Sequence, residues 1–382
     1  MLIRSFVRAL CHVSAAAAVA VALAPSAARA EGEVSSSTAD DQARLLAGLP
    51  VSDGSPLKSL EETAMFKTHA KAVNDAWARL DTRLDKMTDW AKSEVWPKID
   101  AKKPLLYLFG GPDAIGANVL FPDAPAYYLA GLEWVGNVPP PENMKEEALA
   151  QGLNGLRIAL RTSMGKSFFV TKDMSADLTH TELKGVMPIL YIFLVRSGHH
   201  IVDRTMIQID ADGKLQEIPP SRTDRELVQG VRIRFRDEGS ERVQELYYFR
   251  IDLADKNLSK RPGFYPFLKA LGPFNSFLKA ASFILHDPSF TVTKNFILDN
   301  SDAVLQDDSG MPYRAFRKDR WDFHFYGKFS TPTTKAFQGY KQPDLARAVE
   351  EAGEGKPLPF LIGYSHPGKS FLLLATRKAA KD

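Results

Sequence analysis

The chain has 382 residues, with 49 Lys and Arg against 46 Asp and Glu, and Cys11 is its single cysteine. Loss of residues 1–30 would remove that cysteine together with Arg4, Arg8 and Arg29, and would leave 46 bases against 46 acids. A neutral mature chain gives no evidence for membrane-surface binding, and we expect no nucleic-acid partner. Without cysteine, thiol catalysis, thiolate metal sites and disulfides are excluded.

The first predicted element is an export signal over residues 1–30. Arg4 and Arg8 precede an apolar run, Val13–Ala24, that is too short to span a bilayer. Small residues then occupy the positions that a signal peptidase reads, at Ala28-Arg29-Ala30. We therefore expect cleavage after Ala30 and a periplasmic or secreted mature chain without a membrane span. A retained N-terminal anchor is the alternative.

A leader and a long helix are expected next. Residues 31–57 are rich in Ser, Ala, Asp and Gly without sustained periodicity, which predicts a flexible leader. A single mixed α/β domain should follow over 58–382, with a subdivision near 200–230 as an alternative. The segment Ser59–Glu62 matches a capping box, and apolar residues at spacings of three and four predict a helix over 59–97. Its apolar stripe would lie across its own domain or, if exposed, bind a partner.

The following segment predicts a strand, a loop and a second strand. Pro104–Phe109 is typical of a buried strand, Gly110–Asp113 of a tight turn and 114–121 of a short helix or loop. A second strand, Ala126–Leu132, ends at Glu133, which lies about 20 residues after the turn, near the position of the ribose-binding acid in dinucleotide-binding units. No G-x-G-x-x-G pattern is present, however, so we expect no nucleotide and no other cofactor.

The remainder of the chain alternates between helical and strand patterns. Helices are predicted over 143–163, 186–195 and 264–299. Strands are predicted over 201–209, 231–236, 243–253, 322–329, 358–363 and 371–376. The segments 231–236 and 243–253 should pair as a hairpin with a basic outer face. The whole pattern predicts an α/β fold, a mixed sheet flanked by helices, with a long N-terminal helix and a β-rich C-terminal half.

Residues 363–370, GYSHPGKS, match the phosphate-loop pattern G-x-x-x-x-G-K-[ST]. That loop must lead into a helix whose N-terminus faces the phosphates. Lys369 and Ser370 lead instead into an apolar run of strand type, so the match predicts a hairpin turn and no nucleotide site.

Three histidines, His180, His199 and His200, lie near Glu182 and Asp203 in the sequence and could suggest a metal site. A helix between His180 and His199 would hold them about 28 Å apart. The adjacent His199 and His200 would point to opposite faces of a strand. We therefore expect no metal ion bound by these residues.

Two polar clusters remain as candidate sites. The cluster 109–113 follows a buried strand, where α/β sheets commonly contact ligands. The cluster 306–310 follows the apolar run 303–305, and its adjacent carboxylates could bind a hard cation, activate water or orient a polar ligand, although Asp, Ser and Gly are also ordinary turn residues. The candidate catalytic residues are Asp113, Asp307 and Asp308. The candidate ligand-binding residues are Gly110, Gly111, Glu133, Gln306, Ser309, Tyr313 and Arg314.

Several motifs resemble those of a family of exported bacterial proteins of unknown function. These motifs are FGGPD at 109–113, LFP at 120–122, GLE at 131–133 with Gly136, the stretch 278–286, and QDDSG at 306–310. The resemblance covers most of the chain after the leader. It implies no activity, because no reaction is assigned to that family, and it carries over no catalytic residue.

The leading interpretation is an exported ligand-binding or accessory protein whose partner is a small polar ligand or an envelope component. The alternative is an exported hydrolase that uses Asp113 or the Asp307/Asp308 pair, with or without a divalent ion. The hydrolase requires Asp113 and one of the other two carboxylates within roughly 10 Å of each other in one cleft, with at least one perturbed pKa.

Overall fold

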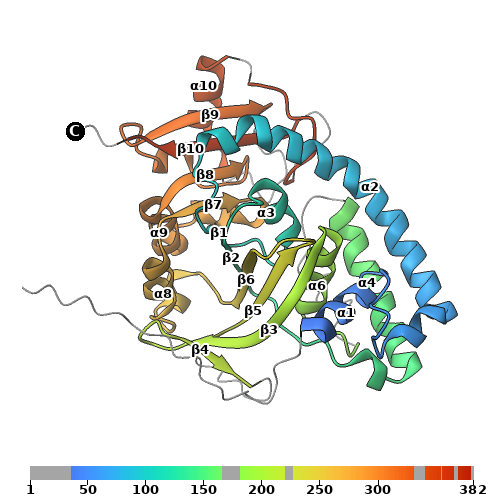
Figure 1. The fold of residues 1–382 in the computed structure, drawn as a ribbon. Helices are drawn as coiled ribbons and strands as arrows, with labels where there is room; N and C mark the ends of the chain where they lie inside the picture. Colours follow the sequence, from blue (N-terminus) through green and yellow to red (C-terminus); the bar gives the residue numbers. More distant parts are fainter. Residues whose placement is uncertain are drawn as a thin grey trace, which may run out of the picture. The chain divides into compact units, whose positions relative to one another are not determined.

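In the computed structural model, ten strands of the described residues form one mixed sheet in the order β4-β3-β5-β6-β2-β1-β7-β8-β10-β9 (Figure 1). The structure describes residues 36–165, 181–219, 227–330, 340–353, 355–364 and 369–379. The strands are β1 (Leu105–Tyr107), β2 (Ala126–Gly131), β3 (His199–Ile209), β4 (Leu215–Ile218), β5 (Val228–Asp237), β6 (Val243–Arg250), β7 (Phe274–Leu278), β8 (Ser301–Asp307), β9 (Trp321–Gly327) and β10 (Phe371–Arg377). The predicted export signal, Cys11, the cleavage position and His180 lie outside the described residues.

Helices cover this sheet, which confirms the predicted α/β fold with a mixed sheet, a long N-terminal helix and a strand-rich C-terminal half. They are α1 (Ser36–Leu46), α2 (Ala64–Glu94), α3 (Ala114–Leu120), α4 (Glu146–Gly165), α6 (Met187–Arg196), α7 (Asp255–Leu258), α8 (Phe264–Leu271), α9 (Thr291–Asn300) and α10 (Pro343–Glu351). Short 3₁₀ helices are η1 (Lys58–Glu62), η2 (Trp96–Lys98), η3 (Pro141–Asn143), η4 (Ala280–His286), η5 (Pro288–Phe290) and η6 (Tyr313–Ala315). In the described part of the chain, no helix has both the length and the apolarity that a membrane crossing needs.

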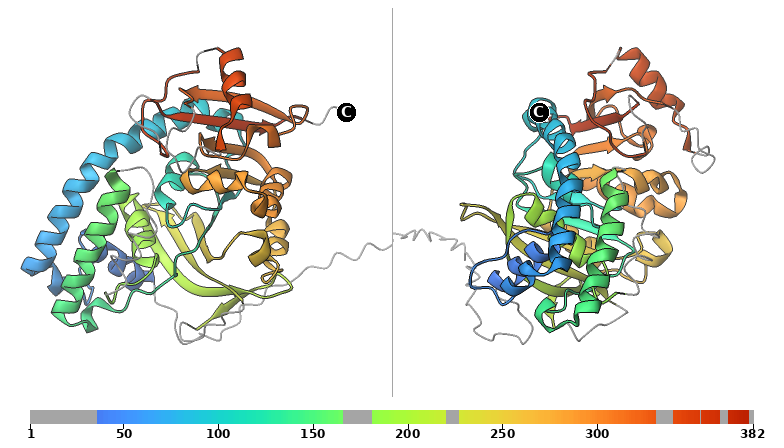
Figure 2. Two further views of the ribbon diagram at one scale, coloured as in Figure 1. Left: turned by 180° about the vertical axis from the view of Figure 1, so that it is seen from behind. Right: turned by 90° about the vertical axis from the view of Figure 1, so that its right-hand side faces the viewer.

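Alternating side chains along the central strands build two hydrophobic cores. Leu105 and Tyr107 of β1 belong to a core shared with α2, α3, α4 and α6. Leu106 and Leu108 belong to a second core, shared with α8 and α9. Figure 2 shows α2 and α4 side by side on one side of the sheet, with α8 and α9 on the other. Helices thus cover both faces of the central strands.

Helix α2 lies across its own domain. Thr63 caps it in place of the predicted Ser59, because the Thr63 side chain accepts a hydrogen bond from the Phe66 N–H at 3.1 Å. Trp77 packs against Phe193 of α6, with ring centroids 6.3 Å apart. Trp90 packs against Tyr326 of β9 at 5.1 Å. The alternative of an exposed, partner-binding stripe is wrong, since this stripe is buried in the core.

The expectation of a flexible leader is wrong for residues 36–57, the part of that segment that the structure describes. Helix α1 packs against α6 and β3, and Ala39, Ala43 and Leu46 are fully buried. The Asp40 carboxylate accepts a hydrogen bond from the Ile201 N–H of β3 at 2.8 Å. Alanine is the strongest helix former, so its abundance here favoured a helix and did not indicate disorder.

Residues 264–299 are not one helical region as expected. Gly272 and Pro273 end α8, and β7 follows between β1 and β8, with all five of its residues buried. A strand that is buried on both faces lacks the alternation that distinguishes strands from helices. Residues 358–363, which we expected to form a strand, form no strand; Phe360 and Ile362 nevertheless join the core beneath α2.

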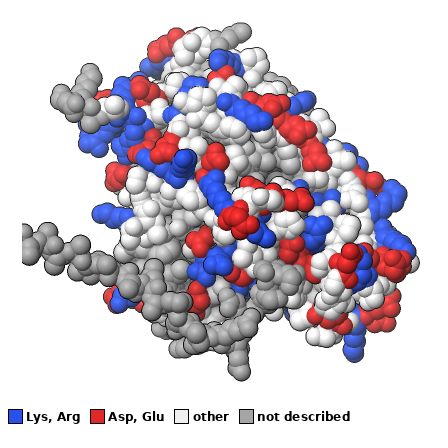
Figure 3. All heavy atoms as spheres, in the orientation of Figure 1, with Lys and Arg blue, Asp and Glu red and all other residues white. Residues whose placement is uncertain are grey.

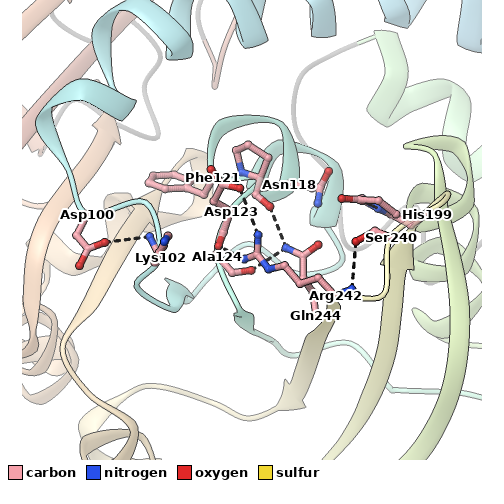
Figure 4. Close-up of polar contacts among 12 residues, drawn as sticks. Asp100, Lys102, Asn118, Phe121, Asp123, Ala124, His199, Ser240, Arg242 and Gln244 are labelled. Atoms are coloured by element: carbon pink, nitrogen blue, oxygen red, sulfur yellow. Dashed lines mark hydrogen bonds and ion pairs between the residues drawn. The ribbon is translucent and has the colours of Figure 1, made fainter.

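The predicted hairpin is present as β5 and β6, which pair antiparallel. At the amino end of β2, Gln244 of β6 and Arg242, which lies just before β6, contact the loop that follows α3, as Figure 4 shows. The Gln244 Nε2 donates to the carbonyl oxygens of Pro122 and Ala124 at 2.9 and 2.8 Å. The Arg242 Nη1 lies 3.3 Å from Asp123 Oδ1. These contacts hold the loop directly before β2. They therefore help to position β2, whose other end lies at the opposite edge of the sheet.

Two arginines of β5 pair with carboxylates of the protein. Arg232 lies 2.7 Å from Glu217, and Arg234 lies 2.6 Å from Asp203 of β3. On the face drawn in Figure 3, basic and acidic side chains are interspersed. Carboxylates of the protein therefore neutralise Arg232 and Arg234 on the predicted basic face of the hairpin.

Candidate functional site

Parallel strands end together at one edge of the sheet. The neighbours β6, β2, β1, β7 and β8 all run parallel, so the residues that follow each of them lie along the same edge. In the sheet, β2 and then β6 lie on one side of β1, whereas β7 and then β8, which come later in the chain, lie on its other side. The strand order therefore reverses between β1 and β7. In open α/β sheets, such a switch point leaves a crevice in which ligands bind.

A cavity of about 220 Å³, here called the switch-point cavity, lies at this edge. Its apolar lining comes from Phe109, Ala130, Leu132, Ile251, Leu253, Ala280, Ala281, Ile284 and Phe290. Its other lining residues are Tyr107, Gly110, Gly111, Asp113, Gly131, Glu133, Asp252 and Lys279. The lining is thus mainly apolar with a few polar groups, as in typical sites for small molecules.

A buried ion pair joins the two strands of the switch point. Lys279, which follows β7, places its Nζ 2.5 Å from Asp113 Oδ2, and both residues are buried. The Tyr107 hydroxyl donates to the same oxygen at 2.7 Å, and the Gly116 N–H donates to Asp113 Oδ1 at 3.2 Å. Burial, and next the Asp113 charge, raise the pKa of Tyr107 well above its ordinary value. Tyr107 therefore remains a hydrogen-bond donor, and Asp113 has protein donors on both oxygens.

Glu133 forms a second buried pair one strand away. The Tyr248 hydroxyl of β6 lies 2.9 Å from Glu133 Oε2. Two glycines make room for this carboxylate: a Cβ on Gly131 would lie 2.2 Å from Glu133 Oε2, and one on Gly111 would lie 3.4 Å from Oε1. Burial, and next the Glu133 charge, raise the pKa of Tyr248 well above its ordinary value. Gly111 and Gly131 therefore accommodate a carboxylate of the protein itself.

Backbone strain marks both sides of the switch point. Phe109, after β1, has φ 69°, and Ala280, after β7, has φ 59°. Side chains with a Cβ rarely adopt this region, and each such residue costs on the order of 1–3 kcal/mol. Strain of this kind clusters at binding and active sites, where the surrounding structure maintains it. Both strained residues line the switch-point cavity.

Asp307 maintains the strained loop. Its Oδ2 accepts from the Ala280 N–H at 3.0 Å, and its Oδ1 accepts from the Ser309 N–H at 2.9 Å and the Ser309 hydroxyl at 2.6 Å. Asp307 is fully buried, and burial raises its pKa. Asp113 and Asp307 thus contact two consecutive residues: Asp113 bonds the Lys279 side chain, and Asp307 bonds the Ala280 N–H. Of these two carboxylates, only Asp113 is among the residues that line the cavity.

The remaining candidates of the 306–314 region do not line the cavity. The Gln306 side chain closes its own turn, with Nε2 donating to the Met311 carbonyl and Oε1 accepting from the Met311 N–H, both at 3.0 Å. The Ser309 Oγ also lies 2.8 Å from the Ala280 carbonyl oxygen. Tyr313 packs against Phe323 of β9, and Arg314 is exposed. Of the predicted site residues, the cavity brings together Gly110, Gly111, Asp113 and Glu133.

The raised pKa of Asp308 predicts that the stability of the protein depends on pH. Burial, and next the Asp307 charge, raise the pKa of Asp308 from 3.8 to about 8. The native state therefore binds more protons than the unfolded chain between these two pH values, and stability falls as pH rises through that window. We expect Asp308→Asn to raise the Tm at pH 8 by at least about 2–4 °C, and to leave it unchanged at pH 4, in thermal unfolding followed by circular dichroism. An equal shift at both pH values would contradict this assignment.

The described histidines have separate partners. His199 Nδ1 lies 2.6 Å from Asp237 Oδ1, whereas His200 Nδ1 lies 3.1 Å from Asp40 Oδ2. Within the residues that the structure describes, no group of three or more His, Cys, Asp or Glu is arranged to hold a metal ion. Lys369 and Ser370 of the GYSHPGKS match lead into β10 and not into a helix. Residues 365–368 of that match lie outside the described residues.

Sequence reasoning missed Lys279, Tyr107 and Tyr248. Lys279 lies in the segment that we expected to be helical. The sequence Gly272-Pro273, which ends α8, was the signal that a separate element, β7, begins at Phe274 and ends just before Lys279. Tyr107 and Tyr248 lie in predicted strands, but only the strand order shows that their hydroxyls reach Asp113 and Glu133.

Comparison with known proteins gives no guide to this site. No family model matches the chain, and neither a curated protein sequence nor a solved structure matches it. Function must therefore be inferred from the geometry of the switch-point cavity.

Proposed function

We propose that this chain is an exported binding protein that holds a small, mainly apolar ligand with one polar group in the switch-point cavity. The observation that carries the proposal is the cavity itself, where an apolar lining surrounds the buried Asp113–Lys279 pair between β1 and β7. The export part rests on the pattern of residues 1–30. The lining favours a more apolar ligand than the small polar one expected from the sequence.

Lys279 is the group best suited to orient such a ligand. An ammonium group has three N–H donors, and in the described residues Lys279 donates to Asp113. A ligand oxygen in the cavity could accept a further hydrogen bond. In a largely apolar cavity such a bond is electrostatically stronger than in water. The pair therefore supplies orientation while the apolar wall supplies most of the affinity.

Filling the cavity tests the proposal. Ala281 lines it, so Ala281→Phe places a ring where the ligand would lie. We expect this variant to bind the neutral dye N-phenyl-1-naphthylamine at least tenfold more weakly than the wild type in fluorescence titrations. The matched control is Ala270→Phe, which adds the same atoms at an exposed position of α8 and should leave the affinity unchanged. Equal affinities in the two variants, with unchanged circular dichroism, would refute the proposed site.

A carboxylate-dependent hydrolase, with or without a divalent ion, is the second candidate. One observation favours it: an Asp308 pKa of about 8 would keep that carboxyl protonated at neutral pH, as a general acid requires. Asp307 and Asp308 do not line the cavity, however, and protein groups donate to both oxygens of Asp113. We therefore rank binding first. Ester hydrolysis by the wild type that Asp308→Asn abolishes would reverse this ranking.

A further inference from the structure

A second cavity, of about 760 Å³, adjoins the switch-point cavity. Leu132, Ile251 and Asp252 line both cavities. These residues follow β2 and β6, two neighbouring parallel strands. The two cavities therefore share a wall at the sheet edge, and a ligand long enough could occupy both.

The second cavity extends along the same edge as far as β5. Arg250 at the end of β6 is paired with Gln229 near the start of the antiparallel β5, and both residues line this cavity. Lys260 and Arg261, which follow α7, also line it. The sheet edge thus carries one cavity at β1 and β7 and the other at β6 and β5.

The two cavities differ in charge. Three cationic side chains, Arg250, Lys260 and Arg261, line the second cavity, whereas Asp252 is its one acidic lining residue among the described residues. Both Asp252 oxygens accept hydrogen bonds within the protein, from the Ala254 N–H at 2.9 Å and from Asn257 Nδ2 at 2.8 Å. Among the described lining residues, the positive side chains Arg250 and Lys260 thus outnumber the one acidic side chain, which favours an anionic group.

Apolar side chains connect the two cavities. Leu132 is 63% exposed although it lies on the shared wall, and Trp134, which lines the second cavity, is 54% exposed. Glu133 between them points inward to Tyr248. The segment after β2 thus turns its large apolar side chains outward beside the cavities. A hydrocarbon chain passing from one cavity to the other would cover Leu132.

We propose that the two cavities hold one amphipathic anion, with its hydrocarbon part in the switch-point cavity and its anionic head group at Arg250 and Lys260. This inference rests on the proposed function and names the class of its ligand. The head group would form charge-assisted hydrogen bonds, which are stronger than neutral ones. The hydrocarbon part would gain burial against the apolar lining.

Titration calorimetry of the purified protein with decanoate and with decan-1-ol tests the proposal. The two compounds share a ten-carbon chain, so their difference isolates the head group. We expect decanoate to bind roughly tenfold more tightly at low salt, with a smaller advantage at high salt. The double variant Arg250→Gln/Lys260→Gln should lose this preference and keep its affinity for decan-1-ol. The matched control is Arg320→Gln/Lys269→Gln, which removes the same charges at exposed positions outside both cavities and should keep the preference.

The outcomes separate this inference from the proposed function. Equal binding of the acid and the alcohol by the wild type would overturn the inference and leave the apolar cavity standing. A preference for decanoate that survives in Arg250→Gln/Lys260→Gln would overturn the assignment of the head group to these residues. Binding of neither compound would overturn both. Retained affinity for decan-1-ol in the double variant serves as the check that it is folded.

Discussion

Replacing Asp113 by alanine is expected to destabilise the protein by about 3–5 kcal/mol, because the change leaves the Lys279 ammonium buried without its carboxylate. The Tyr107 hydroxyl would lose its acceptor as well. Helix α3 would lose its N-cap, which is worth roughly 1 kcal/mol in other proteins. Urea unfolding at neutral pH, with the midpoint and slope compared with those of the wild type, measures this loss.

The matched control for this change is the double variant Asp113→Asn/Lys279→Met. It removes both charges, while the asparagine Oδ1 still caps α3 and its Nδ2 can donate to the Tyr107 hydroxyl oxygen. Replacing a buried ion pair by uncharged groups of similar size is often neutral, so we expect a loss within about 1–2 kcal/mol. If the double variant were as unstable as Asp113→Ala, the unpaired charge would not be the cause.

Removing the Asp307 carboxylate is expected to have the second-largest effect, about 3 kcal/mol or more. In Asp307→Ala, the buried N–H of Ala280 and the partly buried N–H of Ser309 lose their acceptor, and a buried unsatisfied donor costs roughly 1–3 kcal/mol. Ala280 would also lose the contact that maintains its positive φ beside Lys279. We therefore expect weaker binding of N-phenyl-1-naphthylamine together with the lower unfolding free energy.

Ser309→Ala is the control for Asp307→Ala. It removes the hydroxyl that contacts Asp307 and the Ala280 carbonyl, but it keeps the carboxylate and its bond to the Ala280 N–H. We expect it to cost about 1 kcal/mol and to preserve dye binding. Dye binding that stayed at the wild-type level in Asp307→Ala would show that the loop at Ala280 does not depend on this carboxylate.

The parts of the fold that sequence could predict are those with a strong local period. Helix α2 repeats apolar residues at intervals of three and four, and the β5–β6 hairpin joins two strand patterns by a short turn. The cluster 109–113 was placed at the end of a buried strand, and three of its residues that we named do line a cavity. In each case, residues close together in the sequence are enough to predict the element.

The parts that sequence could not predict depend on distant residues. Lys279 reaches Asp113 across 166 positions, and no local pattern shows that β7 inserts beside β1. Asp307 and Asp308 looked like catalytic carboxylates because two adjacent acids at a strand end are compatible with catalysis and with a turn. The structure shows that Asp307 bonds the backbone of another loop. Its role follows from the β7–β8 pairing alone.

The position of β1 also sets the order in which the site can be assembled. It is the first strand among the described residues, yet its second neighbour, β7, begins only at Phe274. Until that residue has been synthesised and β7 has docked, one side of β1 presents unpaired backbone groups, which can pair with other chains. Pairing across so long a separation is intrinsically slow. A chain that stops before Phe274 would therefore contain most of the residues that line the switch-point cavity, but it would lack β7 and the wall that Lys279 and Ala280 supply.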